Sequence, residues 1–516
     1  MMTPMLMLLA IAAPPAADVA VVCPAAFRAE LAPWIEHRVR QGHRLAIIDA
    51  SRTLEEVRAQ LGTLAKTGAL KQIVLVGDVP TGRPAVDGVA TQYVRAKVNI
   101  QWGSEPEIAS DHPYSDFDGD QVPDVGIGRL PANSPAELRD MVRKILDYEN
   151  STDYGQWRRR INFVAGLGSF GALADMALEA AAKKLITDGV PAGYSTSMTF
   201  GSWRSPYCPD PREFRRATLD RLNQGCLFWV YIGHGNRRNV DVMRVPGGAF
   251  PILADRDMPQ LHCRSGSPVA CFLACYAGAF DHPEDCLAEQ MVCTPGGPVA
   301  VYAGSRVTMP YGMAVMGKCM LESCFGDEPA ETLGEAVMRT KRRMMSTEDL
   351  SADRKALDTL AALISPAPAD LAAERAEHMV LFNLLGDPLL RLPQPDRVQL
   401  DVPGRVPSGA TITVRGLSDI AGQAVVELIV RRDRLTFKPP VRAQFEPTSA
   451  FLSRFNETYQ KANDPRLVTT QLSIGSNGRF ECDLNPPADA VGPCHIRVFV
   501  EGEAGCALGH CDLEVH

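Results

Sequence analysis

The 516-residue sequence lacks an excess of basic residues and lacks any long apolar run. It has 53 Lys and Arg residues against 61 Asp and Glu residues, which gives a formal net charge of -8 at pH 7. Proteins that bind nucleic acid usually carry a basic surface, so this balance argues against a nucleic-acid partner. No stretch reaches the roughly 18 apolar residues of a transmembrane helix, so no membrane span is predicted.

Several motifs of common enzyme and metal sites are also missing. None of the 14 cysteines forms a Cys-x-x-Cys pair, which argues against a zinc ribbon. No Gly-x-Ser-x-Gly elbow occurs, and the Gly-Ser spacing around Ser169 does not fit one, which argues against a serine hydrolase of that type. The cysteines are sparse for a disulfide scaffold of this length. Cys506 with Cys511, or Cys482 with Cys494, are candidates for a bridge between which the sequence does not choose.

The N-terminus resembles an export signal. Met5–Ala13 is apolar and is followed by small residues and then by Asp18, as in the core and cleavage region of a signal peptide. The basic residues that usually precede such a core are missing, and the alternative is an apolar tail. We expect a signal peptide over residues 1–17 and a secreted or periplasmic protein.

Strand-like and helix-like segments alternate along most of the chain. Apolar segments such as "VAVVC", "LAII", "IVLVG" and "VGIGRL" are separated by amphipathic ones, including a helix expected over residues 172–189. This alternation is typical of β-α-β units and a parallel sheet. We expect an α/β domain with two subdomains, residues 18–150 and 151–393. From 394 to 516, short alternating strands with an Asn-Gly turn predict an immunoglobulin-like β-sandwich.

Two buried strands each deliver one reactive side chain to their carboxyl end. His234 lies between two glycines after the apolar run "CLFWVYI", and Cys275 ends the run "SPVACFLAC" 41 residues later. Ligands of parallel sheets bind at this edge, and imidazole beside a thiol makes a nucleophile. The alternative is a histidine that only caps a strand and a buried structural cysteine, as we expect for Cys271 in mid-strand.

With these motifs the sequence resembles the gingipain-type family of cysteine peptidases, which share a caspase-like fold. The resemblance covers nearly the whole chain and includes "IVLVGDVP", "DHPYSDFDGDQVPDVGIGRLP", "YIGHGN", "ACYAGAFD" and "FNLLGDPLL". It implies caspase-like parallel sheets flanked by helices, a C-terminal immunoglobulin-like module and a protein or peptide substrate. It also implies a Cys-His dyad that works through a thioester without a cofactor.

The resemblance assigns roles to individual residues. His234 corresponds to the catalytic histidine and Cys275 to the nucleophile, while the backbone N–H groups of Gly235 and Cys275 correspond to the oxyanion hole. Asp124 corresponds to an acidic residue that orients the histidine. Tyr311 corresponds to an aromatic wall of the primary specificity pocket, although an aromatic residue after a strand is more often ordinary packing.

The sequence departs from the family in features that relate to substrate specificity and to activation. Its best-known members cut after Arg or Lys with an acidic pocket, which implies a basic P1 residue here, and Glu137 lies near the relevant segment. Family members are made with a long propeptide, whereas the first strand here directly follows the expected signal peptide. The rival hypothesis is a binding or adhesion protein in which a peptidase-like fold has lost its activity.

The acidic stretch "DFDGDQVPD" predicts a cation site. Asp116, Asp118 and Asp120 have the alternate-position spacing by which a short loop wraps an oxygen-preferring cation. The order of glycine and acidic residues differs from an EF-hand, and a solvated acidic turn is the alternative. Calcium is the natural ligand in an exported protein, and Asp124 does not comfortably serve both this site and His234.

Overall fold

The computed structural model describes residues 16–81, 87–166, 186–348 and 350–516. The expected signal peptide lies almost wholly outside these residues, as do Ser169 and most of the helix expected over 172–189. In the part that is described, no helix is both long and apolar enough to cross a bilayer.

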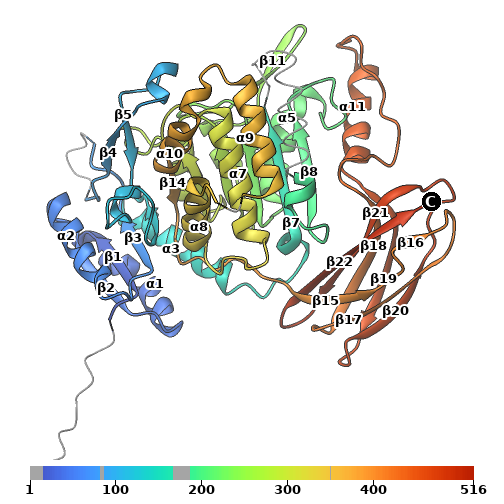
Figure 1. Cartoon of the computed structure of the whole chain (residues 1–516), viewed down its shortest axis with the longest axis horizontal. Coiled ribbons are helices and arrows are strands. Elements are labelled where there is room, and N and C mark those ends of the chain that lie inside the picture. The colour runs from blue at the N-terminus through green and yellow to red at the C-terminus, as the bar shows by residue number, and fades with distance from the viewer. Residues whose placement is uncertain (1–15, 82–86, 167–185, 349) are drawn as a thin grey trace, which may run out of the picture.

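One ten-stranded sheet forms the centre of the larger part of the molecule (Figure 1). Its strands are β1 Val19–Cys23, β2 Leu45–Asp49, β3 Gln72–Val76, β6 Gly126–Leu130, β7 Arg160–Ala165, β8 Ser195–Phe200, β9 Phe228–Ile232, β12 Val269–Leu273, β13 Ala300–Gly304 and β14 Phe382–Leu385. Their order is β2-β1-β3-β6-β14-β13-β12-β9-β7-β8. Neighbours are parallel except at β13 and β14, which are antiparallel, so the predicted parallel α/β architecture is confirmed.

Helices flank the sheet and cover its apolar strands. They are α1 Arg28–Arg40, α2 Leu54–Ala65, α3 Pro135–Glu149, α5 Phe214–Asn223, α6 Leu287–Cys293, α7 Pro310–Phe325, α8 Leu333–Met345, α9 Ala352–Ile364 and α10 Leu371–Leu381. In Figure 1, α7, α8, α9 and α10 form a layer in front of the middle of the sheet. Two short hairpins, β4 Gln92–Arg95 with β5 Glu107–Ser110 and β10 Val242–Val245 with β11 Gly248–Pro251, lie outside the sheet.

Buried aromatic residues pack between β9 and β12, the two strands that lead to the candidate site. Trp229 and Tyr231 of β9 are fully buried, and so is Phe272 of β12. The rings of Trp229 and Phe272 are 5.4 Å apart, and those of Tyr231 and Phe272 are 6.0 Å apart. Aromatic pairs at such distances add to the stabilisation from burial, so they fix the register of the two strands.

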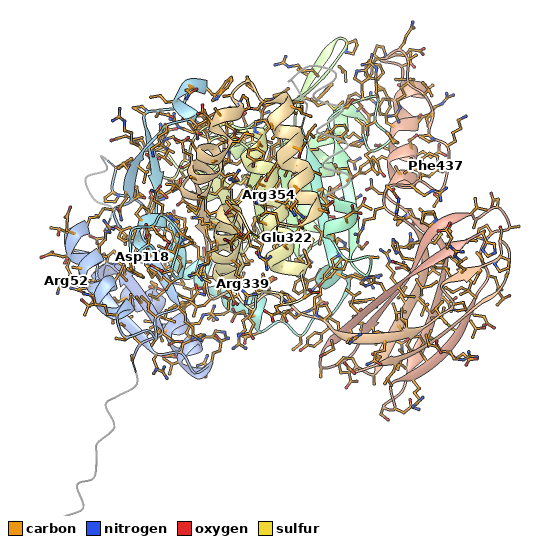
Figure 2. The ribbon with its side chains drawn as sticks, viewed as in Figure 1. Arg52, Asp118, Glu322, Arg339, Arg354 and Phe437 are labelled. Carbon is orange, nitrogen blue, oxygen red and sulfur yellow. The ribbon has the colours of Figure 1, made fainter. Side chains whose placement is uncertain are left out.

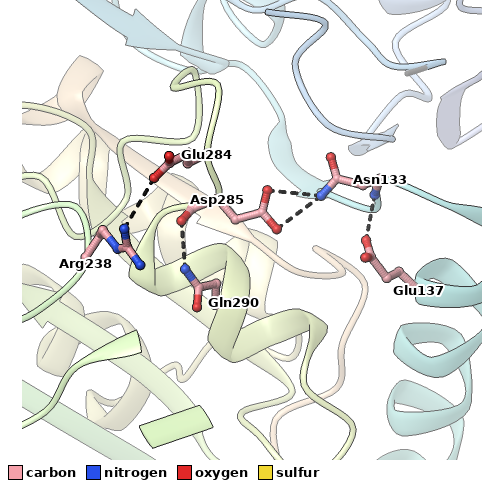
Figure 3. A pocket seen from close by; sticks show the side chains of 6 residues that line it. All are labelled: Asn133, Glu137, Arg238, Glu284, Asp285 and Gln290. Carbon is pink, nitrogen blue, oxygen red and sulfur yellow. Dashed lines mark hydrogen bonds and ion pairs between the residues drawn. The ribbon is translucent and has the colours of Figure 1, made fainter. Parts of the chain in front are cut away.

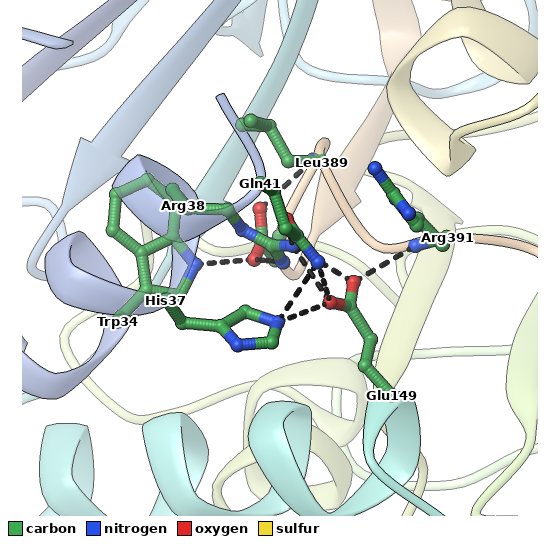
Figure 4. Close-up of polar contacts among 8 residues, drawn as sticks. Trp34, His37, Arg38, Gln41, Glu149, Leu389 and Arg391 are labelled. Atoms are coloured by element: carbon green, nitrogen blue, oxygen red, sulfur yellow. Dashed lines mark hydrogen bonds and ion pairs between the residues drawn. The ribbon is translucent and has the colours of Figure 1, made fainter. Parts of the chain in front are cut away.

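A polar network joins α1, α3 and the loop after β14 (Figure 4). The buried carboxylate of Asp387 accepts hydrogen bonds from the Trp34 indole and from Arg38, at 2.5 Å in the second case. Arg38 also pairs with Glu149 at 2.8 Å, and Glu149 accepts a 3.0 Å bond from the Arg391 amide. The Gly-Asp-Pro motif at Asp387 therefore serves as a structural clamp.

A separate β-structured unit follows residue 394, as predicted. It contains β15 Asp396–Asp401, β16 Arg405–Val406, β17 Ile412–Ser418, β18 Gly422–Val430, β19 Arg466–Ile474, β20 Arg479–Leu484, β21 Gly492–Glu501, β22 Cys506–Val515 and the inserted helix α11 Ser449–Ala462. The strands follow one path, β19-β18-β21-β22-β15-β17-β20, which is nearly closed because β19 also contacts β20. Its immunoglobulin-like topology stays a prediction.

Neither candidate disulfide is formed in the structure. Cys482, Cys494, Cys506 and Cys511 are all free thiols. Cys506 and Cys511 lie five residues apart on β22, and side chains at odd separations in a strand point to opposite faces.

Candidate active site

The pairing of β9 with β12 places His234 beside Cys275. The strands are parallel, with Ile232 paired to Leu273, and the Gly233 amide continues the ladder by donating to the Leu273 carbonyl at 3.2 Å. His234 and Cys275 each lie two residues beyond that last pair. Neighbouring strands are about 4.8 Å apart, so the two residues meet at the same carboxyl edge, and both are half-buried.

The glycines on either side of His234 are required by close approaches. A Cβ on Gly235 would lie 2.7 Å from the carbonyl oxygen of Cys275 and 3.1 Å from the Cβ of Ala274. A Cβ on Gly233 would lie 2.7 Å from the Tyr231 hydroxyl. Real Cβ atoms do not approach other atoms so closely, so a larger residue at either position would move the histidine loop.

A hydrogen bond from the buried Tyr231 holds the backbone of His234 in place. The Tyr231 hydroxyl donates to the His234 carbonyl at 2.9 Å and accepts a 3.2 Å hydrogen bond from the Asp241 amide. Burial and the neighbouring Asp241 carboxylate raise the pKa of Tyr231 well above its usual value, so the hydroxyl stays a donor. This contact fixes the histidine to the end of β9.

The sulfur of Cys275 faces donors from the next strand. Thr308 follows β13, and its amide donates to the sulfur at 3.3 Å, while its hydroxyl oxygen lies 3.4 Å from the same atom. The Cys275 thiol in turn donates to the Thr308 carbonyl at 3.7 Å. Burial raises the pKa of Cys271, four residues earlier, to about 12 and that of Cys23 to about 12. The expectation that Cys271 is a core residue is confirmed.

The residue after Cys275 has an unusual backbone conformation. Tyr276 has a φ of 56°, in the left-handed region that non-glycine residues rarely adopt. Its hydroxyl donates to Glu105 at 2.6 Å, and Glu105 also pairs with Arg237 at 3.0 Å. Its amide donates to the Arg306 carbonyl at 3.1 Å. The sequence analysis missed this clamp and Thr308; the adjacency of Tyr276 to Cys275 was the only signal available.

The structure shows Asp124 in contacts within its own loop and with Arg342, and its predicted role toward His234 stays a prediction. Asp124 lies two residues before β6, at the amino end of that strand. Its carboxylate accepts a 2.8 Å hydrogen bond from the Phe117 amide, and its carbonyl accepts one from Arg342. In the sheet, β14, β13 and β12 lie between β6 and β9, the strand that ends before His234. Asp124 closes the acidic loop.

The acidic loop brings its three predicted ligands together. Asp116, Asp118 and Asp120 each offer an oxygen, and these oxygens lie within 4.8 Å of one another. Figure 2 shows Asp118 on the side of the molecule formed by the first half of the sheet. Asp116 also accepts hydrogen bonds from the amides of Gly119 and Gln121, which shape the turn. Clustered carboxylate oxygens fit Ca²⁺ chemically, and calcium there stays a prediction.

Tyr311 and Glu137, the two residues that the sequence links to substrate specificity, lie on different helices, α7 and α3. Tyr311 begins α7, and its hydroxyl bonds to Asp358 at 2.8 Å and to Arg375 at 2.6 Å. Asp358 also binds Arg354, which Figure 2 shows in the helical layer. Glu137 instead lines a polar pocket of about 560 Å³ (Figure 3), with Asn133, Arg238, Glu284, Asp285 and Gln290. The roles of Tyr311 and Glu137 in specificity stay predictions.

Comparison with known proteins agrees with this arrangement. Residues 12–393 match the model of the family described as Peptidase family C25. Lys-gingipain of Porphyromonas gingivalis is 22% identical over 322 residues, which cover 60% of this chain and 17% of that protein. This chain therefore matches less than a fifth of the length of its curated relatives.

Two solved structures share the fold over nearly the whole chain. One is the Arg-specific cysteine proteinase gingipain R, with a TM-score of 0.55, 16% identity, and coverage of 97% of this chain and 98% of that one. The other is a complex of pro- and mature domains from Porphyromonas gingivalis, with a TM-score of 0.54, 17% identity, and coverage of 97% and 100%. These likenesses confirm the predicted fold.

Proposed function

The chain belongs to peptidase family C25, and we propose that it is a cysteine endopeptidase whose nucleophile is Cys275 and whose general base is His234. The observation that carries this proposal is the register of β9 and β12, which delivers both side chains to one edge at the same level. The amide and hydroxyl of Thr308 beside the sulfur support a reactive thiol. A protein that only binds peptides has no need of this pairing.

The chemistry follows from the positions of these groups. The Cys275 sulfur attacks the scissile carbonyl, and His234 takes the thiol proton. His234 then returns this proton to the departing amine, which leaves a thioester on Cys275. A water molecule attacks the thioester while His234 takes its proton, and that proton returns to the sulfur as the new carboxyl group leaves. No cofactor takes part in these steps.

The developing oxyanion needs preorganised donors, and we assign that role to the backbone amides of Gly235 and Cys275. In the described part of the chain, neither amide donates a hydrogen bond to another backbone carbonyl. The contact between Gly235 and the Cys275 backbone keeps both amides at the dyad. Amides held in place before the reaction stabilise the negative charge without reorganisation.

Substrate and location extend the proposal. The substrate is a protein or peptide, and a basic P1 residue is proposed because relatives named for Lys and Arg share the family and the fold. Tyr311 is proposed as a wall of the P1 pocket. Asp116, Asp118 and Asp120 would hold a structural Ca²⁺ that supplies no chemistry, and we propose that the protein is secreted or periplasmic.

The test is alkylation of the folded protein with iodoacetamide at neutral pH, mapped by mass spectrometry, with His234→Ala as the matched control. We expect fast labelling confined to Cys275 and much slower labelling when His234 is replaced. A panel of peptides that differ at P1 then tests hydrolysis and specificity. If Cys275 reacts no faster than other exposed cysteines and no peptide is cut, the binding-protein alternative replaces this proposal.

A further inference from the structure

Thr308 surrounds the sulfur of Cys275 with three polar atoms. Its amide donates to the sulfur at 3.3 Å, its hydroxyl oxygen lies 3.4 Å from the sulfur, and its carbonyl accepts from the thiol at 3.7 Å. Thr308 belongs to residues 305–309, the segment that connects β13 to α7. The position of this segment therefore sets the surroundings of the thiol, and the residues that hold the segment act on Cys275 through Thr308.

The residue after Thr308 is held by a buried histidine of α10. The Met309 amide donates to His378 Nε2 at 2.8 Å, and His378 Nδ1 lies 2.7 Å from the carbonyl oxygen of Glu374. A carbonyl only accepts, so Nδ1 carries the ring proton and Nε2 is the acceptor for the amide. Burial lowers the pKa of His378 to about 4, so the ring stays neutral and keeps this acceptor at neutral pH.

The residue before Thr308 is held by a buried asparagine. Asn99 is fully buried, and its Nδ2 donates to the Val307 carbonyl at 2.6 Å. The backbone at Asn99 is fixed in turn, because the carboxylate of Glu377 on α10 accepts from the three successive amides of residues 97–99. Hydrogen bonds to a charged group are stronger than those between neutral groups, so Glu377 holds Asn99 firmly against Val307.

Both contacts start from one helix. His378 and Glu377 are adjacent on α10, which contacts β5 and lies beside it in Figure 1. His378 acts on residue 309 directly, and Glu377 acts on residue 307 by way of Asn99. Thr308 lies between these two points, so α10 fixes its backbone from both sides. Packing alone would not require both partners to border the residue that contacts the sulfur.

Building on the proposed peptidase function, we propose that His378 and Asn99 are positioning residues of the active site, which hold Thr308 against the sulfur of Cys275. Without either side chain a buried backbone group would lose its partner, which is unfavourable, so residues 307–309 would shift toward another partner. Such a shift would move the Thr308 amide away from the sulfur. Small displacements at an active site lower the rate of the chemical step strongly.

The first experiment compares His378→Leu with His378→Gln in the full-length protein. Leucine has no acceptor, whereas the side-chain carbonyl of glutamine can accept from the Met309 amide. We expect His378→Leu to lower kcat about tenfold or more at nearly unchanged KM, and His378→Gln to recover most of that loss. Iodoacetamide should label Cys275 at least about threefold more slowly in His378→Leu, because the Thr308 amide can donate to the reactive thiolate.

His112→Leu is the control for the loss of a buried histidine. His112 is 2% exposed and lies in the short helix η3 His112–Tyr114, before the acidic loop. This variant should lower the melting temperature while kcat and the labelling rate per folded molecule stay unchanged.

The second experiment removes the other contact with Asn99→Leu. Its matched control is Asn162→Leu, because Asn162 is also fully buried and its Nδ2 also donates to a backbone carbonyl, that of Arg221, at 2.9 Å. We expect Asn99→Leu to lower kcat and the Cys275 labelling rate as His378→Leu does. Asn162→Leu should change neither quantity per folded molecule, although it should also lower the melting temperature.

Unchanged kcat and labelling in both His378→Leu and Asn99→Leu would overturn this role. Equal losses in the two controls would also overturn it, because the effect would then follow from lower stability alone. If His378→Leu and Asn99→Leu do not fold, Glu377→Gln takes their place, and an unchanged kcat there has the same meaning. Failure of the peptidase function itself is seen in wild type, which would then neither cut peptides nor label fast at Cys275, and the positioning role would fall with it.

Discussion

The two halves of the ten-stranded sheet are built alike, yet their carboxyl ends are used differently. In the second half, β9 and β12 end at His234 and Cys275, which are half-buried. In the first half, β6 carries Arg129, which is fully buried and pairs with Asp111 at 2.7 Å while bonding to the carbonyls of Gly77 and Val89. The rim of the second half carries the two residues of the proposed active site, and the rim of the first half is held by internal hydrogen bonds and an ion pair.

The carboxyl ends of the strands in the two halves differ in which side chains remain available to bind a ligand. The guanidinium of Arg129 is fully engaged by hydrogen bonds within the protein, and the carboxylate of Asp111 neutralises its charge. The sulfur of Cys275 lies beside the Thr308 amide, which donates to it, and the Thr308 carbonyl, which accepts from it. The same β-α-β construction therefore yields a structural rim or a reactive rim according to the partners that surround the strand ends.

Replacement of the nucleophile should give the largest effect. Cys275→Ala is expected to lower peptide hydrolysis by about 10³-fold or more, because a side chain that forms the covalent intermediate is lost. Stability should change by less than about 1 kcal/mol, since the thiol is half-buried. Steady-state hydrolysis and urea unfolding measure the two quantities.

The matched control is Cys271→Ala on the same strand. It should keep the activity of the folded enzyme and lose stability by about 1 kcal/mol, because a buried sulfur leaves a small cavity. Equal losses of activity from the two replacements would show that the rim position of Cys275 has no special role.

Arg129→Met should produce the largest loss of stability. Removing one partner of a buried ion pair costs about 3–5 kcal/mol, because the Asp111 carboxylate is left buried and unpaired. Urea unfolding measures this loss, and Arg129→Met combined with Asp111→Asn should recover part of it. Activity per folded molecule should change little. A selective loss of kcat at unchanged stability would mean that the first half also takes part in catalysis.

Gly235→Ala should separate geometry from stability within the reactive rim. The added Cβ would lie 2.7 Å from the Cys275 carbonyl, so the histidine loop must shift. Small displacements of catalytic groups commonly cost 10- to 100-fold in rate, and we expect such a fall in kcat/KM. The exposed Gly404→Ala, where nothing lies within 4 Å of the new Cβ and the backbone is not left-handed, is the control for an added methyl group. Equal effects on rate would refute the close approach.

Tyr276→Phe should give the smallest effect. It removes one hydrogen bond to Glu105, worth about 1 kcal/mol, and leaves the ring and backbone in place. A three- to tenfold fall in kcat with little change in KM is expected if this bond positions the Cys275 loop. Glu105→Gln should behave similarly. No change in either variant would assign the clamp to surface stability alone.

The fold, and the placement of His234 and Cys275 at one edge of the sheet, were predictable because they rest on local signals. Apolar strands with period and length typical of parallel sheets gave the architecture, and the Gly-His-Gly and Ala-Cys endings marked a rim. The sequence also does not reveal the order of the strands, so it does not show that β14, β13 and β12 lie between the strand after Asp124 and the strand before His234. Glu105 reaches Tyr276, and Thr308 reaches Cys275, only through tertiary packing, and their own sequence surroundings carry no sign of it.

The pairing of β9 with β12 also sets when in the life of the chain the thiol can become reactive. Leu273 can pair with Ile232 only once the intervening residues 233–268 have formed a connection between the two strands. Contacts between segments that are distant in the sequence form late in folding. Until then the imidazole and the sulfur are parts of a flexible polymer and seldom meet. If the proposed function holds, a nascent or misfolded copy carries an ordinary cysteine, and the protein gains the capacity to cut other chains only once its own chain is compact and resists cleavage.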